Sequence, residues 1–296
     1  MKWEYLREEE FEGAIEKCGG LCVLPMGCLE KHGQHLPVGT DSLKAMALAE
    51  QAAEIEEVMV FPTGLWLGEV CGFHANPNPG ANKQRGGIAI NPQTLFTVLE
   101  ELCVEIARNG FRKILFLDSH GGNTALLDQF VRTMYYKPRD FAVMETKVTD
   151  AKITRPENMY PTVLARRDEF AYLTDEDMEA LRKFSETGTG GGHADWKETA
   201  LIYAYYPKLV AADKFDAEDG LSTHRADHLQ KLGINCGRFW PSNYPNAYNG
   251  YSPFGCSHNI GKAMAQLSVE RLVEMFKVLK ADEECVRMAK RLPPLK

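Results

Sequence analysis

The sequence predicts an α/β protein built on a largely parallel central sheet. Short apolar runs of strand length alternate along the chain with longer segments whose apolar residues recur at helical spacing. One unit, residues 113–134, has the order strand, tight glycine turn and helix that is typical of parallel sheets. No repeat, linker or change of composition divides the chain, so we expect a single domain over residues 1–296.

Four apolar runs have the length of strands rather than helices. They are Leu21–Pro25, Val58–Phe61, Lys113–Leu117 and Phe141–Met144. The turn-prone pair Met26-Gly27 follows the first run, and Gly121-Gly122 lies shortly after the third. We therefore expect loops at the ends of these two strands.

Helices are expected between the strands and after them. The predicted segments are Tyr5–Lys17, Asp41–Ile55, Pro92–Ile106, Thr124–Met134, Thr174–Phe184, the stretch through Glu198 to Tyr205, and Asn259–Lys280. The clearest of them has Asn91 as its cap and Pro92 at its first position. Asp41 and Asn123 are the predicted N-caps of two others, because short polar side chains accept the free N–H groups of a first turn.

The composition indicates a globular protein and argues against several functional classes. Of the 296 residues 44% are hydrophobic, which is enough apolar surface to offset the entropy of ordering. A formal net charge of −7 without a basic patch argues against nucleic acid as a partner. The sequence lacks a long apolar run, and the charged segment Met1–Glu10 lacks the pattern of a signal peptide. We therefore expect a cytoplasmic protein without a membrane partner.

Residues 30–41 hold the densest group of metal-ligating side chains. Glu30, His32, His35 and Asp41 follow the first predicted strand and supply the oxygen and nitrogen ligands that Zn²⁺, Mn²⁺ or Fe²⁺ prefer. In an extended segment Glu30 and His32 point to the same side. Taken singly, each residue fits a structural role, and Asp41 could simply cap a helix. Together, at the carboxyl end of a parallel strand, they favour a functional site.

Two later segments carry residues of the same kind. His120 follows the third strand, and Gly121 and Gly122 beside it permit a tight turn and the close approach of a metal or substrate. His193 follows the glycine-rich residues 188–192, and Glu198 lies in the helix after it, where a buried carboxylate would need a partner. The structural alternatives are an ordinary turn at His120 and a solvated loop before His193.

These segments resemble, in the same order, the motifs of the creatininase (creatinine amidohydrolase) family. Residues 27–41 are similar to its G-[ST]-x-E-Q-H-G-P-H-L-P…D opening, and residues 119–123 to its N-G-H-G-G-N turn. Residues 193–199 resemble its H-A-G-E-x-E-T segment, and residues 87–95 its G-T-I-S-L-S-P-E-T-L stretch. Departures from the family pattern include Lys31, Gln34, Asp118 and the pair Asp195-Trp196.

The resemblance implies a three-layer α/β/α fold, often assembled as a hexamer, with one or two divalent metal ions (Zn, Mn or Fe). By motif, Glu30, Asp41 and His120 would hold one ion, and His32 with the bridging Asp41 would hold the other. Creatininase has a glutamate where this chain has Gly122, so a ligand of the second ion is missing. Glu198 is the candidate replacement; otherwise one of the two sites is weak or empty.

The same resemblance makes His193 the general acid and base and places Glu198 with it in the catalytic machinery. The expected reaction is the attack of hydroxide on a carbonyl of a small cyclic substrate, which breaks the C–N bond of an amide, lactam or formamide. Ring-opening C–C hydrolysis of an oxidised cyclitol and a non-catalytic, ligand-binding role remain alternatives. A peptidase that trims chain ends is less favoured, because long insertions argue for a closed pocket.

The predicted pocket-forming insertions lie near residues 63–87 and 154–192. They contain aromatic and basic side chains suited to an anionic or polyhydroxylated small molecule, namely Trp66, His74, Lys83, Arg85, Tyr160 and Arg166. Partners other than this substrate are expected to be further copies of the chain in a homo-oligomer.

Overall fold

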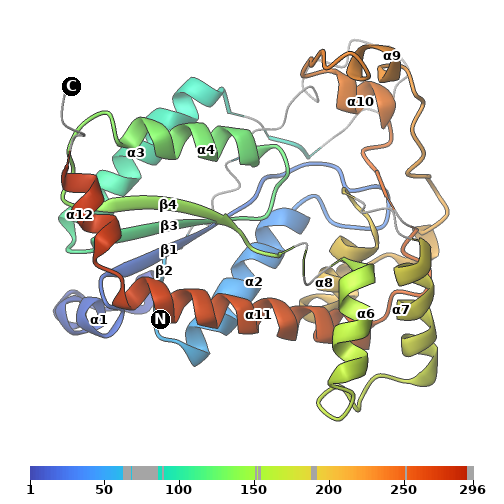
Figure 1. The fold of residues 1–296 in the computed structure, drawn as a ribbon, viewed down its shortest axis with the longest axis horizontal. Coiled ribbons are helices and arrows are strands. Elements are labelled where there is room, and N and C mark those ends of the chain that lie inside the picture. The colour runs from blue at the N-terminus through green and yellow to red at the C-terminus, as the bar shows by residue number, and fades with distance from the viewer. Residues whose placement is uncertain are drawn as a thin grey trace.

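A parallel sheet of four strands forms the centre of the computed structural model (Figure 1). The structure describes residues 1–62, 68, 86–88, 90–150, 152, 155–187, 192–250 and 252–291. The strands are β1 (Leu21–Met26), β2 (Met59–Val60), β3 (Lys113–Asp118) and β4 (Ala142–Lys147). Their order is β2-β1-β3-β4, and every pair is parallel. The predicted strands and the parallel sheet are thus confirmed.

Helices cover both faces of the sheet, as Figure 1 shows. One face packs on α1 (Phe11–Lys17), α3 (Pro92–Arg108) and α4 (Asn123–Met134), and the other on α2 (Thr40–Ile55), α8 (Trp196–Tyr205) and α11 (His258–Ala281). Successive side chains of a strand point to opposite faces. Cys22 and Leu24 therefore belong to the first core, whereas Leu21 and Val23 belong to the second. This arrangement is the predicted three-layer α/β/α fold.

Further helices surround these layers. They are α6 (Pro156–Ala165), α7 (Asp175–Thr187), α9 (Asp227–Gln230), α10 (Phe239–Asn243) and α12 (Glu284–Lys290), with 3₁₀ turns at Trp3–Tyr5, Glu8–Glu10, Pro207–Leu209 and Ala212–Lys214. The sequence patterns predicted α7 but not α6, α9, α10 or α12. None of the helices among the described residues is both long enough and apolar enough to cross a membrane.

Two of the predicted N-caps are wrong. The helix α2 begins at Thr40 with Gly39 as its cap, so Asp41 lies in its first turn. The helix α4 is capped by Gly122, and the side chain of Asn123 bonds elsewhere. The predicted cap of α3 is confirmed, because the Asn91 side chain accepts the N–H of Gln93.

The strand order places a crevice between β1 and β3. The chain leaves β1 toward β2 on one side and returns to β3 on the other, and α2 and α3 lie on opposite faces. Parallel sheets bind ligands at such a switch point, beyond the carboxyl ends of the strands. Met26 and Asp118 are register partners at these ends, so the loops that follow them meet there.

Candidate metal centre

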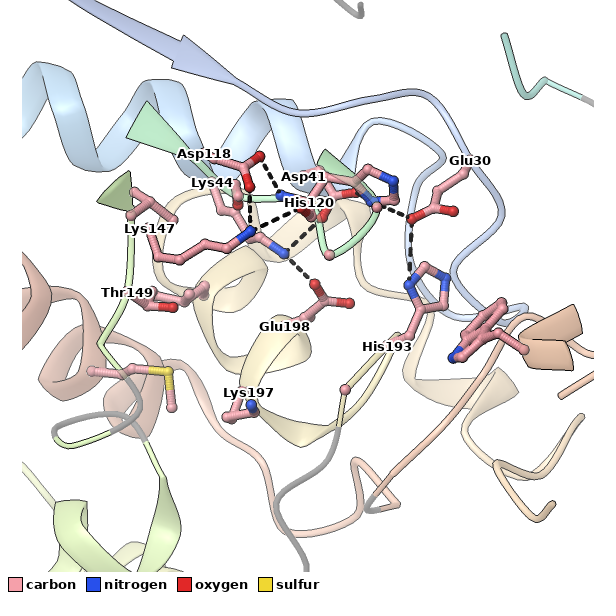
Figure 2. A pocket seen from close by; sticks show the side chains of 18 of the residues that line it. Glu30, Asp41, Lys44, Asp118, His120, Lys147, Thr149, His193, Lys197 and Glu198 are labelled. Carbon is pink, nitrogen blue, oxygen red and sulfur yellow. Dashed lines mark hydrogen bonds and ion pairs between the residues drawn. The ribbon is translucent and has the colours of Figure 1, made fainter. Parts of the chain in front are cut away.

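Six side chains from four segments converge beyond the carboxyl ends of β1 and β3 (Figure 2). The segment after β1 supplies Glu30 and His32, α2 supplies Asp41, and the turn after β3 supplies His120. The start of α8 and the residues just before it supply the other two, Glu198 and His193. All six are buried. The structure therefore brings together these six predicted residues, whereas His35, named with them in the sequence, lies outside the ligand groups with its Nε2 2.9 Å from the Ala194 carbonyl oxygen.

The first group of donors surrounds His120. Its Nδ1 lies 2.9 Å from Glu30 Oε1 and 3.1 Å from Asp41 Oδ2. Cys28 joins this group, because its thiol lies 3.3 Å from Asp41 Oδ2. The group thus offers two carboxylates, an imidazole and a sulfur to one ion.

The second group of donors surrounds His32. Its Nε2 lies 3.5 Å from Asp41 Oδ1 and 3.4 Å from Glu198 Oε2. Asp41 therefore belongs to both groups, one oxygen in each, as a bridging ligand would. Lys44, from the next turn of α2, also enters this group: its Nζ lies 2.8 Å from Asp41 Oδ1 and pairs with Glu198 Oε1.

Backbone carbonyls orient two of the histidine rings. His32 Nδ1 lies 3.1 Å from the Glu30 carbonyl oxygen, and His193 Nε2 lies 2.7 Å from the Lys31 carbonyl oxygen. A carbonyl can only accept, so each of these ring nitrogens carries the proton. The other nitrogens of the two rings, His32 Nε2 and His193 Nδ1, face the carboxylates of the cluster. The two rings stack with their centroids 4.2 Å apart.

A carboxylate at the end of β3 holds the turn that carries His120. Asp118 Oδ1 accepts the backbone N–H of His120 and the side-chain amide of Asn123, each at 3.0 Å. Its other oxygen pairs with Lys147, whose ammonium also donates to the His120 carbonyl at 3.1 Å. Asn123 is the first residue of α4, and its amide ties the start of this helix to Asp118. This network fixes the position of the His120 ring.

The carboxylates shift the pKa values of the histidines around them. Burial lowers the pKa of His32, but Asp41 and Glu198 outweigh it and raise this pKa to about 9. At His120, Glu30 and Asp41 likewise overcome burial and hold the pKa well above its ordinary value. At His193 burial prevails over Glu30 and lowers the pKa. The cluster therefore attracts positive charge.

Two buried atoms of the cluster show that a divalent cation fits there. Within the part of the chain that the structure describes, Glu30 Oε1 and His32 Nε2 make ionic contacts but no hydrogen bond. An unsatisfied buried polar atom costs about 1–3 kcal/mol. A cation bound among the first group of donors would satisfy Glu30 Oε1, and carboxylate, imidazole and thiol donors suit Zn²⁺, Mn²⁺ or Fe²⁺.

A cavity of about 540 Å³ opens beside the cluster, a volume suited to a small molecule. Its wall combines charged residues with aromatic and apolar ones, among them Glu30, His120, Lys147, His193, Lys197, Glu198, Leu201, Trp240 and Met264. Trp240 meets the His193 ring edge-on, with the ring centroids 5.1 Å apart. Figure 2 shows Glu198 and His193 facing the cavity from one side and Lys147 from another.

The two predicted insertions contribute differently to this cavity. Gly192 is the described lining residue from segment 154–192. Tyr160 instead packs on the hydrophobic core, and Arg166 pairs with Glu169 and Glu270. Of segment 63–87, Gly68 lies against the site: a Cβ there would be 2.5 Å from the Gly27 carbonyl oxygen. Outside the described residues lie Trp66, His74, Lys83 and Arg85.

Sequence reasoning missed Lys44 and Lys147 and did not assign Cys28 a role. Lys44 did carry a signal, because it follows Asp41 by three residues and so shares its helix face, next to Ala45 and Leu48. A lysine on an apolar helix face needs a buried partner. Lys147 lies at the end of an ordinary strand pattern, and nothing local distinguishes it.

Comparison with known proteins identifies the family. The model of the creatininase family, described as creatinine amidohydrolase, matches residues 4–276. The chain belongs to the creatininase family. Creatinine amidohydrolase of Pseudomonas putida is 25% identical over 207 residues, which cover 70% of this chain and 72% of that protein. Members of the creatininase family are hydrolases, and we describe this chain as a creatininase-family hydrolase.

Two further similarities concern a curated peptidase and a solved structure. Mycofactocin precursor peptide peptidase of Mycolicibacterium smegmatis is 28% identical over 140 residues, 44% of this chain and 51% of that protein. A solved structure described as "Creatininase Mn" shares 19% identity and a TM-score of 0.67, covering 95% of this chain and 99% of that one. The likeness to the solved structure confirms the creatininase fold. The names of the curated relatives show that they act on different substrates.

Proposed function

We propose that this creatininase-family protein is a divalent-metal-dependent hydrolase of a small cyclic substrate, whose C–N bond in an amide, lactam or formamide it breaks. The ligands would be Glu30, Asp41 and His120 for one ion, with His32 and Glu198 beside the shared Asp41. The observation that supports this proposal is the convergence of these five buried side chains, two of which have a buried atom without a hydrogen bond, on the wall of a cavity of ligand size.

A bound divalent ion would supply Lewis acidity, which lowers the pKa of water and polarises a carbonyl. His193 would move the proton. Its Nε2 proton is held by the Lys31 carbonyl, so Nδ1 is the atom that accepts a proton from the attacking water and returns it to the leaving nitrogen. Trp240 packs on the ring and limits the access of solvent to it.

Glu198 would act by holding the site in place rather than by moving a proton. Its Oε2 accepts the backbone N–H of Ala194 at 2.6 Å, and Oε1 pairs with Lys44. The first contact fixes the residue next to His193, so Glu198 links the base to the donors on α2. This link explains how one carboxylate can serve both the ligand set and the catalytic machinery.

A second candidate reaction is the ring-opening hydrolysis of an oxidised cyclitol, in which a C–C bond beside a ketone breaks. Trp240 and Pro241 line the cavity, and a flat aromatic surface suits a polyhydroxylated ring. The metal remains Zn, Mn or Fe; the relative described as "Creatininase Mn" supports manganese among them. A homo-oligomer, a single domain over residues 1–296 and a cytoplasmic location also remain proposals.

The experiment that tests the function is elemental analysis of protein purified without chelators or added metal, followed by turnover assays. The assays compare cyclic amides, lactams and formamides with oxidised cyclitols and short peptides. We expect bound Zn, Mn or Fe and turnover of one class of small ring, both lost in Asp41→Asn. The matched control is Asp177→Asn, which removes a buried carboxylate outside the donor groups and should retain its metal. Protein without metal that also lacks turnover after metal loading would refute the proposal in favour of a non-catalytic role.

A further inference from the structure

Lys44 is a buried lysine in the middle of the donor cluster. Only 4% of the residue is exposed, and its ammonium contacts two carboxylates, Asp41 and Glu198. These two ion pairs compensate the burial of the Lys44 ammonium. Figure 2 shows the ammonium reaching toward Glu198. A positive charge is therefore already present in the cluster before any metal binds.

The cluster contains three overlapping groups of possible ligands, and the Lys44 charge belongs to one of them. The third group, Glu30 with His32 and His193, shares Glu30 with the first. Lys44 bonds to Asp41 Oδ1 and Glu198 Oε1, and these two residues with His32 form the second group. The first group is different. Within the described part of the chain, Glu30 has ion pairs only with histidines, which can release their protons to a metal. In the second group the ammonium of Lys44 itself lies against the Asp41 and Glu198 oxygens.

The charge balance of the cluster agrees with one metal ion. Glu30, Asp41 and Glu198 carry three negative charges, and Lys44 carries one positive charge, while ligating histidines are neutral. A single divalent ion makes this buried group neutral. A second divalent ion would leave an excess of two positive charges in a buried site, which is costly unless they are paired.

We propose that Lys44 takes the place of a second metal ion, so that the centre binds one divalent ion at Glu30, Asp41 and His120. The inference rests on the proposed metal-dependent function and deepens it. Lys44 holds the Asp41 and Glu198 carboxylates in the positions that a bridging dinuclear centre would otherwise require. It also accounts for Gly122: with an ammonium in the second group, the glutamate that creatininase has at this position is not needed.

The test measures the metal content of three proteins after dialysis against Mn²⁺ or Zn²⁺. They are the wild type, Lys44→Met and the matched control Lys197→Met, which removes another lysine of the same cavity that lies outside the donor groups. We expect about one ion per chain for the wild type and for Lys197→Met. Lys44→Met should bind about two, because the Asp41 and Glu198 charges then need a new cation.

The outcomes separate this inference from the proposed function. Wild-type protein with two ions per chain, or a folded Lys44→Met that still binds one, would overturn the role of Lys44 and leave the hydrolase proposal intact. Wild-type protein that binds none would overturn the metal-dependent function itself. If Lys44→Met does not fold, electron paramagnetic resonance of the Mn²⁺-loaded wild type decides. The hyperfine pattern of an isolated ion is expected, and the spin-coupled signal of a metal pair would refute the inference.

Discussion

The close contact between α8 and α11 supports the site and can be tested by one methyl group. Gly261 lies on α11 where that helix crosses α8. A Cβ at this position would lie 2.1 Å from the Ala200 carbonyl oxygen and 2.9 Å from the Ala204 nitrogen. Non-bonded atoms prefer separations of about 3.5 Å or more. Gly261→Ala therefore requires the two helices to separate by about 1 Å.

The structure sets the expected size of the effect. Overpacking a buried contact costs about 1–3 kcal/mol, and here the atoms that must move are backbone. Alanine recovers up to about 1 kcal/mol of helix propensity, so we expect a net loss of about 2 kcal/mol, or about 4 °C in Tm for a chain of this size. The control is Gly13→Ala in α1, where a Cβ meets nothing within 4 Å. That variant should gain about 0.5–1 kcal/mol.

The same variant should affect catalysis, because Ala200 is two residues from Glu198 on α8. A shift of about 1 Å in a catalytic group can lower the rate by about 10²-fold. We would measure urea unfolding and, at 25 °C where the protein is folded, turnover of the substrate found by the screen. Gly261→Ala with the stability and turnover of the wild type would refute this account of the contact. Equal losses in Gly261→Ala and Gly13→Ala would do so too.

Two further predictions address the base and a buried cap. His193→Gln should lower kcat by about 10²–10⁴-fold while elemental analysis finds the metal content of the wild type, because the change removes the base and leaves the main ligands; loss of the metal would instead make His193 a ligand. Asp177 accepts hydrogen bonds from Ser257, Asn259 and the Thr174 N–H, which outweigh burial and lower its pKa below the ordinary 3.8. The stabilisation that ionised Asp177 gives to the folded protein is therefore complete above pH 3.8. It is lost as the pH falls through the lower pKa that this carboxyl has in the folded state. Urea unfolding should show Asp177→Asn less stable by about 1–3 kcal/mol at pH 7, with a difference that narrows in acid; a constant difference would contradict this.

Elements with strong local patterns were predictable from the sequence. The strands β1 and β3 are continuous apolar runs because both of their faces are covered by helices. The helix α3 has an apolar stripe and a capping residue, so its position followed from nearby residues alone. The position of α6 could not be predicted from nearby residues, because Pro161 lies inside this helix and disfavours helical structure locally. Its packing against α7 stabilises it, and that contact is tertiary.

The site shows the same division between local and long-range information. The metal-ligating residues could be predicted because Glu30, His32 and Asp41 lie close together in the chain. The partner of Asn123 could not be predicted, because the turn after β3 sets where its amide meets Asp118.

The role of Lys44 depends most strongly on long-range contacts. Locally it is one charged residue on an alanine-rich helix, and its spacing of three from Asp41 indicates the first of its two partners but not the second. Its second partner, Glu198, lies 154 residues further along the chain and reaches it because α8 packs on the same face of the sheet as α2. The motif therefore predicts which side chains can bind a metal. The number of cations that these side chains require depends on the charges that the fold buries among them, and here the chain itself supplies one.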